Sequence, residues 1–133
     1  MTTIRLQRSA LGEYVATNEA GGQVRIGGEV EFSAVELLLA ALAACTAIDV
    51  DHVTSRRAQP EQFAVEVSAR KERTEQGNRL LDVVVGFEVR FPQGPEGDAA
   101  RTVLPRIAAE SHDRLCTVGR SLELPTPVRV ELR

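Results

Sequence analysis

The chain has few aromatic residues: its 133 residues include no tryptophan, one tyrosine and four phenylalanines. The core must therefore be built from valine, leucine, isoleucine and alanine. A chain of this length can bury roughly two thirds of the surface that its unfolded form exposes, so it needs no disulfide or metal to hold it together. We expect residues 1–133 to form a single domain.

The chain also lacks an excess of charge of one sign and a long apolar segment. Its net charge is −3, and a clustered basic face of the kind that binds nucleic acid is not expected. The first residues alternate polar and apolar side chains, unlike a signal peptide. An apolar run over residues 35–50 is too short to span a bilayer. We expect a cytoplasmic protein with no nucleic-acid or membrane partner.

Cysteine is scarce as well, because Cys45 and Cys116 are the only two. In the cytoplasm such a pair is more typical of core residues, metal ligands or redox-active thiols than of a structural disulfide. Cys45 lies in an apolar segment, where cysteine is commonly a small buried hydrophobic residue. Cys116 follows His112 by one helical turn, and a nearby imidazolium or helix N-terminus favours a thiolate.

A zinc site is an alternative use of these side chains, with Cys45, His52, His112 and Cys116 as ligands. Neither cysteine–histidine pair has the close spacing of zinc ribbons or fingers. Cys45 and His52 would also lie about 10 Å apart along one helix axis, too far to share one ion. We therefore expect no metal and no cofactor.

Hydrophobic periodicity and turn residues predict an α+β fold with the element order β3–α–β2–α–β. We expect short strands around residues 4–6, 14–15 and 24–26, a helix over 34–57, strands over 63–67 and 81–91, a helix over 99–115 that Pro105 kinks or splits, a short segment over 116–122 and a last strand over 128–132. Ser33 and Glu36 have the spacing of a capping box at the start of the first helix. The first half of this helix is apolar on every side, which predicts burial all round, and its polar second half should emerge into water.

Two segments resemble one known family. The stretch ELLLAALAACTAIDV, residues 36–50, is similar to the central helix of the OsmC/Ohr thiol peroxidases, and SHDRLCTVGRSLELPTPVRVEL resembles their second-cysteine segment and last strand. The resemblance covers most of the chain and both cysteines. It implies an intertwined homodimer, with two sheets wrapped around long central helices and active sites built from both subunits. It also implies an antioxidant oxidoreductase that reduces organic hydroperoxides in the response to oxidative stress.

The same resemblance assigns roles to individual residues. It implies that Cys45 is the peroxidatic cysteine, that Cys116 resolves it, and that a dithiol or lipoylated protein reduces the resulting disulfide. The family's arginine, which stabilises the thiolate, corresponds best to Arg25. The family's peroxidases place a glutamate ten residues before the cysteine, where this chain has Val35. Glu36 is the neighbouring candidate, although its position favours a capping role.

Two hypotheses about function remain open. The first is a two-cysteine peroxidase. The second is a non-catalytic OsmC-fold dimer that binds a small hydrophobic ligand in an apolar pocket around Cys45. Asp49, one turn after Cys45, could replace the missing glutamate by holding the arginine, but its carboxylate would also repel a thiolate. Only the first hypothesis requires the two sulfur atoms to lie within disulfide reach.

Overall fold

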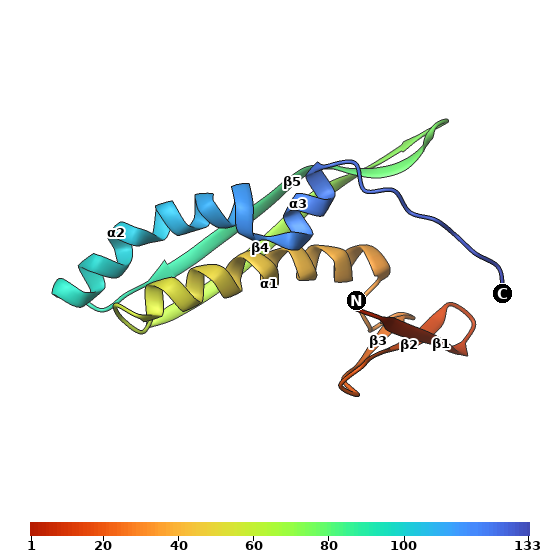
Figure 1. The fold of residues 1–133 in the computed structure, drawn as a ribbon, viewed down its shortest axis with the longest axis horizontal. Helices are drawn as coiled ribbons and strands as arrows, with labels where there is room; N and C mark the ends of the chain where they lie inside the picture. The colour runs from red at the N-terminus through yellow and green to blue at the C-terminus, as the bar shows by residue number, and fades with distance from the viewer. The chain divides into compact units, whose positions relative to one another are not determined.

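The computed structural model describes residues 1–133 and contains two compact units, Met1–Ala40 and Ala41–Arg133. Its elements alternate along the chain as an α+β protein, which confirms the predicted class (Figure 1). They are β1 (Ile4–Ala10), β2 (Glu13–Asn18), β3 (Gln23–Gly27), α1 (Ala34–Ser55), β4 (Gln62–Thr74), β5 (Gly77–Arg90), α2 (Pro95–Glu110), η1 (Ser111–Leu115) and α3 (Thr117–Glu123).

The first unit is built on an antiparallel sheet in the order β1-β2-β3, as the alternating N-terminal sequence predicts. Both connections are tight turns. The β3 strand ends at Gly27, whose φ of 91° lies in the left-handed region that favours glycine. A Cβ atom at this position would also clash with the carbonyl oxygen of Gly12. Glycine is therefore required where β3 leaves the sheet and the chain turns toward α1.

The start of α1 is fixed by the predicted capping box, which is confirmed. The backbone N–H of Ser33 donates to Glu36 Oε1, and the backbone N–H of Glu36 donates to Ser33 Oγ, each over 3.1 Å. These two bonds satisfy backbone donors that a helix N-terminus otherwise leaves without partners. The helix ends at Ser55, close to the predicted residue 57.

The predicted burial of α1 is wrong for the single chain. Its buried residues are Thr46, Val50 and Thr54, and the last two lie in the polar half, from Asp49 on, that was expected to emerge into water. In the apolar first half, Leu38 is 37% exposed, and further along the helix Ile48 is 56% exposed. The prediction failed because composition states how apolar a helix is, but not whether its own chain supplies enough neighbours to cover it.

The β4–β5 hairpin confirms the predicted pair of alternating strands. The rings of Phe63 and Phe87 meet edge to face on its half-buried side, with centroids 6.2 Å apart. The alternation is interrupted at Val83 and Val84, which are 40% and 59% exposed. The interruption has a local cause, because the register of the two strands shifts between Ser68 and Arg70.

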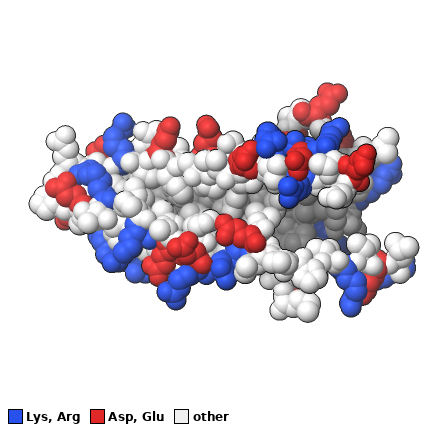
Figure 2. Space-filling view, turned by 90° about the horizontal axis from the view of Figure 1, so that it is seen from above, with Lys and Arg blue, Asp and Glu red and all other residues white.

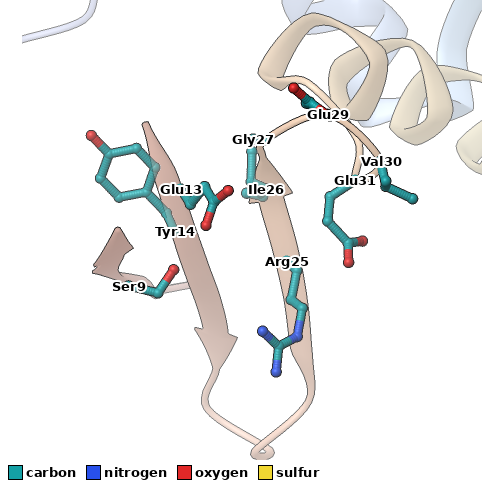
Figure 3. Close-up of a pocket in the computed structure, with 10 residues that line it drawn as sticks. Ser9, Glu13, Tyr14, Arg25, Ile26, Gly27, Glu29, Val30 and Glu31 are labelled. Atoms are coloured by element: carbon teal, nitrogen blue, oxygen red, sulfur yellow. The ribbon is translucent and has the colours of Figure 1, made fainter. Parts of the chain in front are cut away.

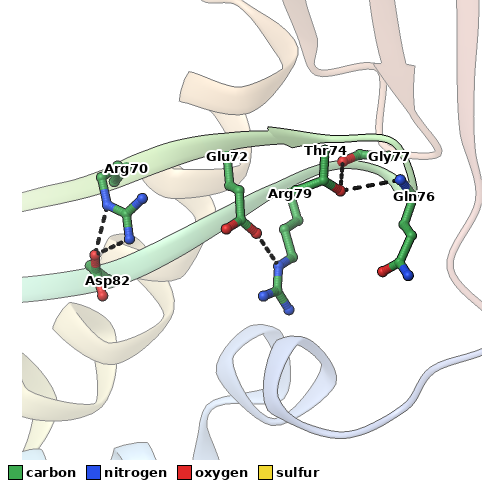
Figure 4. Close-up of polar contacts among 7 residues, drawn as sticks. All are labelled: Arg70, Glu72, Thr74, Gln76, Gly77, Arg79 and Asp82. Atoms are coloured by element: carbon green, nitrogen blue, oxygen red, sulfur yellow. Dashed lines mark hydrogen bonds and ion pairs between the residues drawn. The ribbon is translucent and has the colours of Figure 1, made fainter.

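The outer part of the hairpin carries polar cross-strand contacts (Figure 4). Arg70 pairs with Asp82 at 2.9 Å, and Arg79 pairs with Glu72 at 2.8 Å. Exposed pairs of this kind each contribute at most about 1 kcal/mol. Their main effect is to keep this end of the hairpin polar and in register.

Helix α2 begins at Pro95, four residues before the predicted start, and proline is well suited to a first helical turn. It continues through Pro105 to Glu110, so of the two predicted effects of Pro105, a kink or a split, the split is excluded. The helix packs on the end of β5. Buried Ala100 contacts buried Phe91 and Ala58, and partly buried Val89 and Leu104 pack against this cluster.

The predicted last strand over residues 128–132 is also wrong for the single chain, because these residues pair with no strand. Apolar and charged residues alternate in it as expected, but Val128, Val130 and Leu132 are 86%, 84% and 99% exposed. A strand needs a neighbouring backbone to pair with, and this chain does not provide one.

The surface shows no segregation of charge on the face drawn in Figure 2, where acidic and basic side chains are interspersed. None of the helices is both long and apolar enough to cross a membrane.

The first turn of α2 yields a prediction about stability. A Cβ atom on buried Gly97 would clash with the carbonyl oxygen of Pro92. We expect Gly97→Ala to lower the free energy of unfolding by about 2–3 kcal/mol, as overpacking does, in denaturant titrations at fixed protein concentration. Gly86→Ala is the matched control, because a Cβ there would lie 3.8 Å from the nearest backbone oxygen, an ordinary contact. Equal stability of the two variants would contradict this account of α2.

Candidate functional site

The second unit brings the two cysteines together. Cys45 lies on α1 and is half-buried, whereas Cys116 is 1% exposed and forms the N-cap of α3. Their side chains are near enough for Cys116 to influence the ionisation of Cys45. The fold thus brings together two thiols that are 71 positions apart in the sequence, as a disulfide-forming pair would need.

The backbone before Cys116 leaves the α-helical pattern. After α2 the chain makes the π-helical turn η1, and the N–H of Cys116 donates to the carbonyl oxygen of Ser111 over 2.8 Å. Cys116 itself is extended, with φ −71° and ψ 102°. Its Sγ accepts a hydrogen bond from the backbone N–H of Gly119 over 3.2 Å. The sulfur therefore has a fixed direction at the start of α3.

Gly119 gives α3 room to approach α1 beside this sulfur. A Cβ atom at position 119 would lie 3.3 Å from Cys116 Sγ and 3.4 Å from Leu42 Cδ1, tighter than most contacts of this type. Leu42 lies one turn before Cys45 on α1. The absent side chain thus allows the start of α3 to pack against the helix that carries the other thiol.

The electrostatic environment of Cys45 has opposing parts. Burial raises the pKa of the Cys45 thiol above its ordinary value, because a desolvated thiolate is disfavoured. The adjacent Cys116 side chain raises this pKa further, since two thiolates in contact would repel each other. The backbone N–H groups of Val118 and Thr117, in the first turn of α3, act in the opposite direction. Together, burial, the Cys116 side chain and these backbone N–H groups keep the Cys45 thiol mostly protonated at neutral pH.

A cavity of about 500 Å³ opens beside Cys116, and Cys45 is not among the residues that line it. Most of its lining is apolar and comes from α1, β5 and α3, with Cys116 in its wall. Its remaining polar residues include His112 and Glu123, whose Nε2 and Oε1 atoms lie 3.2 Å apart. The apolar lining residues are Leu42, Val83, Val84, Val85, Phe87, Ala108 and Leu122. The cavity suits an apolar group placed against Cys116.

The side chains considered for zinc do not gather into one site. His112 contacts Glu123, and His52 is exposed beside Asp51 and Arg56 near the end of α1. No group of three or more histidine, cysteine, aspartate or glutamate side chains has a geometry that could hold a metal ion.

Arg25 lies on β3 in the first unit, opposite Val15 of β2. It is exposed and lines a hollow of about 440 Å³ together with Glu13, Glu29 and Glu31. Figure 3 shows its guanidinium pointing away from Gly27, so the group is not covered by its own strand.

Glu36 is engaged at the start of α1. The hydrogen bonds from the side chain and backbone of Ser33 lower the pKa of its carboxyl group. The side chain is thus used by the capping box described above, which is the role that its position in the sequence favoured.

A further contact near the thiols was not predicted from the sequence. Ser111 is fully buried, and its Oγ donates to Asp49 Oδ2 over 2.7 Å, joining the end of α2 to α1. Asp49 was considered as a partner of the arginine, but one of its oxygens accepts this bond. The only signal in the sequence is that each residue lies a few positions after or before a cysteine.

Comparisons with known proteins agree with this fold. The OsmC family, described as OsmC-like protein, matches residues 27–131. An uncharacterized protein of Mycobacterium tuberculosis is 29% identical over 136 residues, covering 99% of this chain and 96% of the relative. An OsmC-like protein of Vibrio cholerae has a TM-score of 0.75 at 13% identity, with 92% of this chain and 94% of the other covered.

The fold also matches a protein named for its function. The organic hydroperoxide resistance protein OsmC of Legionella pneumophila has a TM-score of 0.59 at 14% identity, with 92% of this chain and 88% of that chain covered. At these identities the solved structures show a common fold. The family match, which spans most of the sequence, shows more: this chain belongs to the OsmC family.

Proposed function

We propose that the protein is a two-cysteine peroxidase that reduces organic hydroperoxides, with Cys45 as the peroxidatic and Cys116 as the resolving thiol. The observation that carries this proposal is that the fold places the two thiols, 71 positions apart in the sequence, near each other. Membership of a family that includes an organic hydroperoxide resistance protein supports it. We place the activity in the cytoplasm, where free cysteines stay reduced between turnovers, as an antioxidant defence against oxidative stress.

The proposed chemistry has three steps. The Cys45 thiolate attacks the O–O bond of the hydroperoxide, and with one proton this gives an alcohol and a sulfenic acid on Cys45. The Cys116 thiol then displaces water from the sulfenic acid to form the disulfide. A dithiol, such as a lipoylated protein, reduces this disulfide by thiol exchange and restores both thiols.

The apolar cavity is where we place the organic part of the hydroperoxide. Valine, leucine and phenylalanine side chains line most of its wall, and Cys116 belongs to the same wall. An alkyl or aryl group bound there would exclude water from the reacting atoms. No cofactor enters these steps.

A cation is needed because burial and Cys116 raise the pKa of Cys45. We assign this role to Arg25, whose guanidinium is exposed on β3. Its rigid set of five donors can pair with a thiolate and also orient the peroxide oxygens. We leave Glu36 in the capping role and outside the chemistry.

We further propose that the protein is a homodimer and that residues 1–133 act as one domain within it. The support is the apolar surface that a single chain leaves uncovered. Ile48 on α1 and Val84 on β5 are 56% and 59% exposed, and the unpaired tail exposes Val130 at 84%. A second copy could cover the helix and supply a neighbouring strand for the tail.

The non-catalytic alternative has two observations in its favour. The same apolar cavity would suit a small hydrophobic ligand, and a raised pKa is also what an unreactive core thiol has. This alternative predicts that the affinity for the hydrophobic ligand does not depend on the redox state of the cysteines, either in the parent protein or in its cysteine variants, because neither thiol takes part in turnover.

The roles of the two cysteines predict different kinetics for their variants. We expect Cys45→Ser to abolish reduction of cumene hydroperoxide. Cys116→Ser should complete one turnover and then stop, because the sulfenic acid on Cys45 has no resolving thiol and can over-oxidise. Single-turnover and steady-state assays with a lipoyl reducing system measure both effects. Equal steady-state rates for Cys116→Ser and the parent would remove the resolving role, and no turnover in any protein would favour the ligand-binding alternative.

The role of Arg25 predicts a shift in the pH profile of Cys45. Removing the cation in Arg25→Ala should raise the pKa of Cys45, so less thiolate is present at neutral pH and the alkylation profile moves to higher pH. We expect peroxide reduction to slow by at least about tenfold, which corresponds to a loss of roughly 1.4 kcal/mol of transition-state stabilisation. Arg8→Ala, on β1 of the same sheet, is the matched control. Parental profiles for Arg25→Ala would exclude this residue from the mechanism.

The uncovered apolar surface predicts the mass in solution. Sedimentation at micromolar protein should give twice the chain mass of 14.5 kDa, since stable obligate interfaces commonly bury more than about 2,000 Å². Ile48→Asp should shift this species toward monomer, whereas Arg56→Ala, exposed just after the end of α1, should not. A parent protein that sediments only as the single chain would contradict the dimer.

A further inference from the structure

The hydrogen bond between Asp49 and Ser111 has a particular place relative to the two thiols. Asp49 lies four residues after Cys45 on α1, so it projects one turn further along the same helix. Ser111 is the first residue of the π-helical turn that ends at Cys116. The bond from Ser111 Oγ to Asp49 Oδ2, 2.7 Å long, therefore joins the two segments that carry the cysteines.

Ser111 also holds Cys116 directly. Its carbonyl oxygen accepts the backbone N–H of Cys116 over 2.8 Å, across the π-helical turn. Ser111 thus binds α1, the helix that carries Cys45, through its side chain, and it binds Cys116 through its backbone carbonyl group. Ser111 is fully buried and Asp49 is half-buried, so water competes little for either bond.

We propose that Asp49 and Ser111 are positioning residues that hold Cys116 against Cys45 for disulfide formation. The proposal rests on the two-cysteine chemistry above and names two residues in addition to the thiols. Neither residue exchanges protons or electrons with the substrate. Their effect is to keep two thiols at short range, which raises the effective concentration of one sulfur at the other.

The step that they assist is the second one. The Cys116 sulfur attacks the Cys45 sulfenic acid, the S–S bond forms, the S–O bond breaks, and the hydroxyl leaves as water with the Cys116 proton. Reduction by a dithiol breaks the same S–S bond, returns both cysteines to thiols and leaves the dithiol oxidised to its own disulfide. If Cys116 were held less firmly in place, any dithiol would reduce the disulfide more easily, whichever oxidant had formed it.

The test measures the reduction potential of the Cys45–Cys116 disulfide in buffers of reduced and oxidised dithiothreitol, which needs no hydroperoxide. We expect Ser111→Ala and Asp49→Ala to make the disulfide at least about tenfold easier to reduce, a shift of about 30 mV to less negative potential. Asp49→Asn should stay near the parental potential, because its amide oxygen still accepts the serine hydroxyl.

Ser55→Ala is the matched control. It removes another serine–aspartate bond on α1, from Ser55 Oγ to Asp51 Oδ1 over 2.9 Å, away from the thiols. Thermal unfolding of the reduced proteins separates lost stability from lost positioning. If Ser111→Ala does not fold, the comparison of Asp49→Ala with Asp49→Asn carries the test.

The outcomes distinguish this proposal from the proposed function. Parental potentials for Ser111→Ala and Asp49→Ala, or an Asp49→Asn shift as large as that of Asp49→Ala, would overturn the positioning role alone. A parent protein that forms no disulfide between Cys45 and Cys116 under any of these buffers would overturn both proposals. A shift in the alanine variants with rescue by asparagine would support the positioning role.

Discussion

The contact between Cys45 and Cys116 depends on how α1 meets the chain segment that follows α2. Three local features meet there: the buried bond from Ser111 to Asp49, the π-helical turn before Cys116, and the missing side chain at Gly119. Each is small. Together they determine where the Cys116 sulfur lies, in which direction it points, and how closely α3 approaches α1 beside it. The long helices and the β4–β5 hairpin provide the rigid frame for these features.

Bringing two thiols together in a partly desolvated place has an electrostatic consequence. The packing that creates the contact also makes Cys45 harder to ionise, because burial and the second sulfur both disfavour a thiolate. The backbone amides at the start of α3 compensate in part. The second unit therefore contains the thiol that we propose as the nucleophile, and the exposed cation that we assign to its activation, Arg25 on β3, belongs to the other unit.

Elements that depend on neighbouring residues could be predicted from the sequence. The Ser33–Glu36 capping box, the three N-terminal strands and the central hairpin all follow from local spacing, and each is present. The resemblance to a known family identified the cysteine pair that the structure brings together. Its assignment of chemical roles is a separate matter, because a shared fold does not fix a function.

Features that depend on distant neighbours could not be predicted in the same way. The exposure of Ile48 on α1 and the unpaired tail after Pro127 depend on which surfaces meet, and sequence spacing does not contain that information. The same is true of the bond between Asp49 and Ser111, which joins residues 62 positions apart. Of the two outcomes predicted at Pro105, a kink or a split, the split does not occur: α2 continues through this proline, because tertiary packing overrides a local preference.

The π-helical turn Ser111–Leu115 also limits how this segment can change in evolution. Surface connections usually accept insertions and deletions, because nothing rigid depends on their length. Here the deletion of one residue would rotate everything after it by about 100° around the helix axis. Cys116 would then face away from α1, although every residue of chemical interest would still be in the sequence. The spacing between α2 and the second cysteine is therefore as restrictive as the identity of the cysteine.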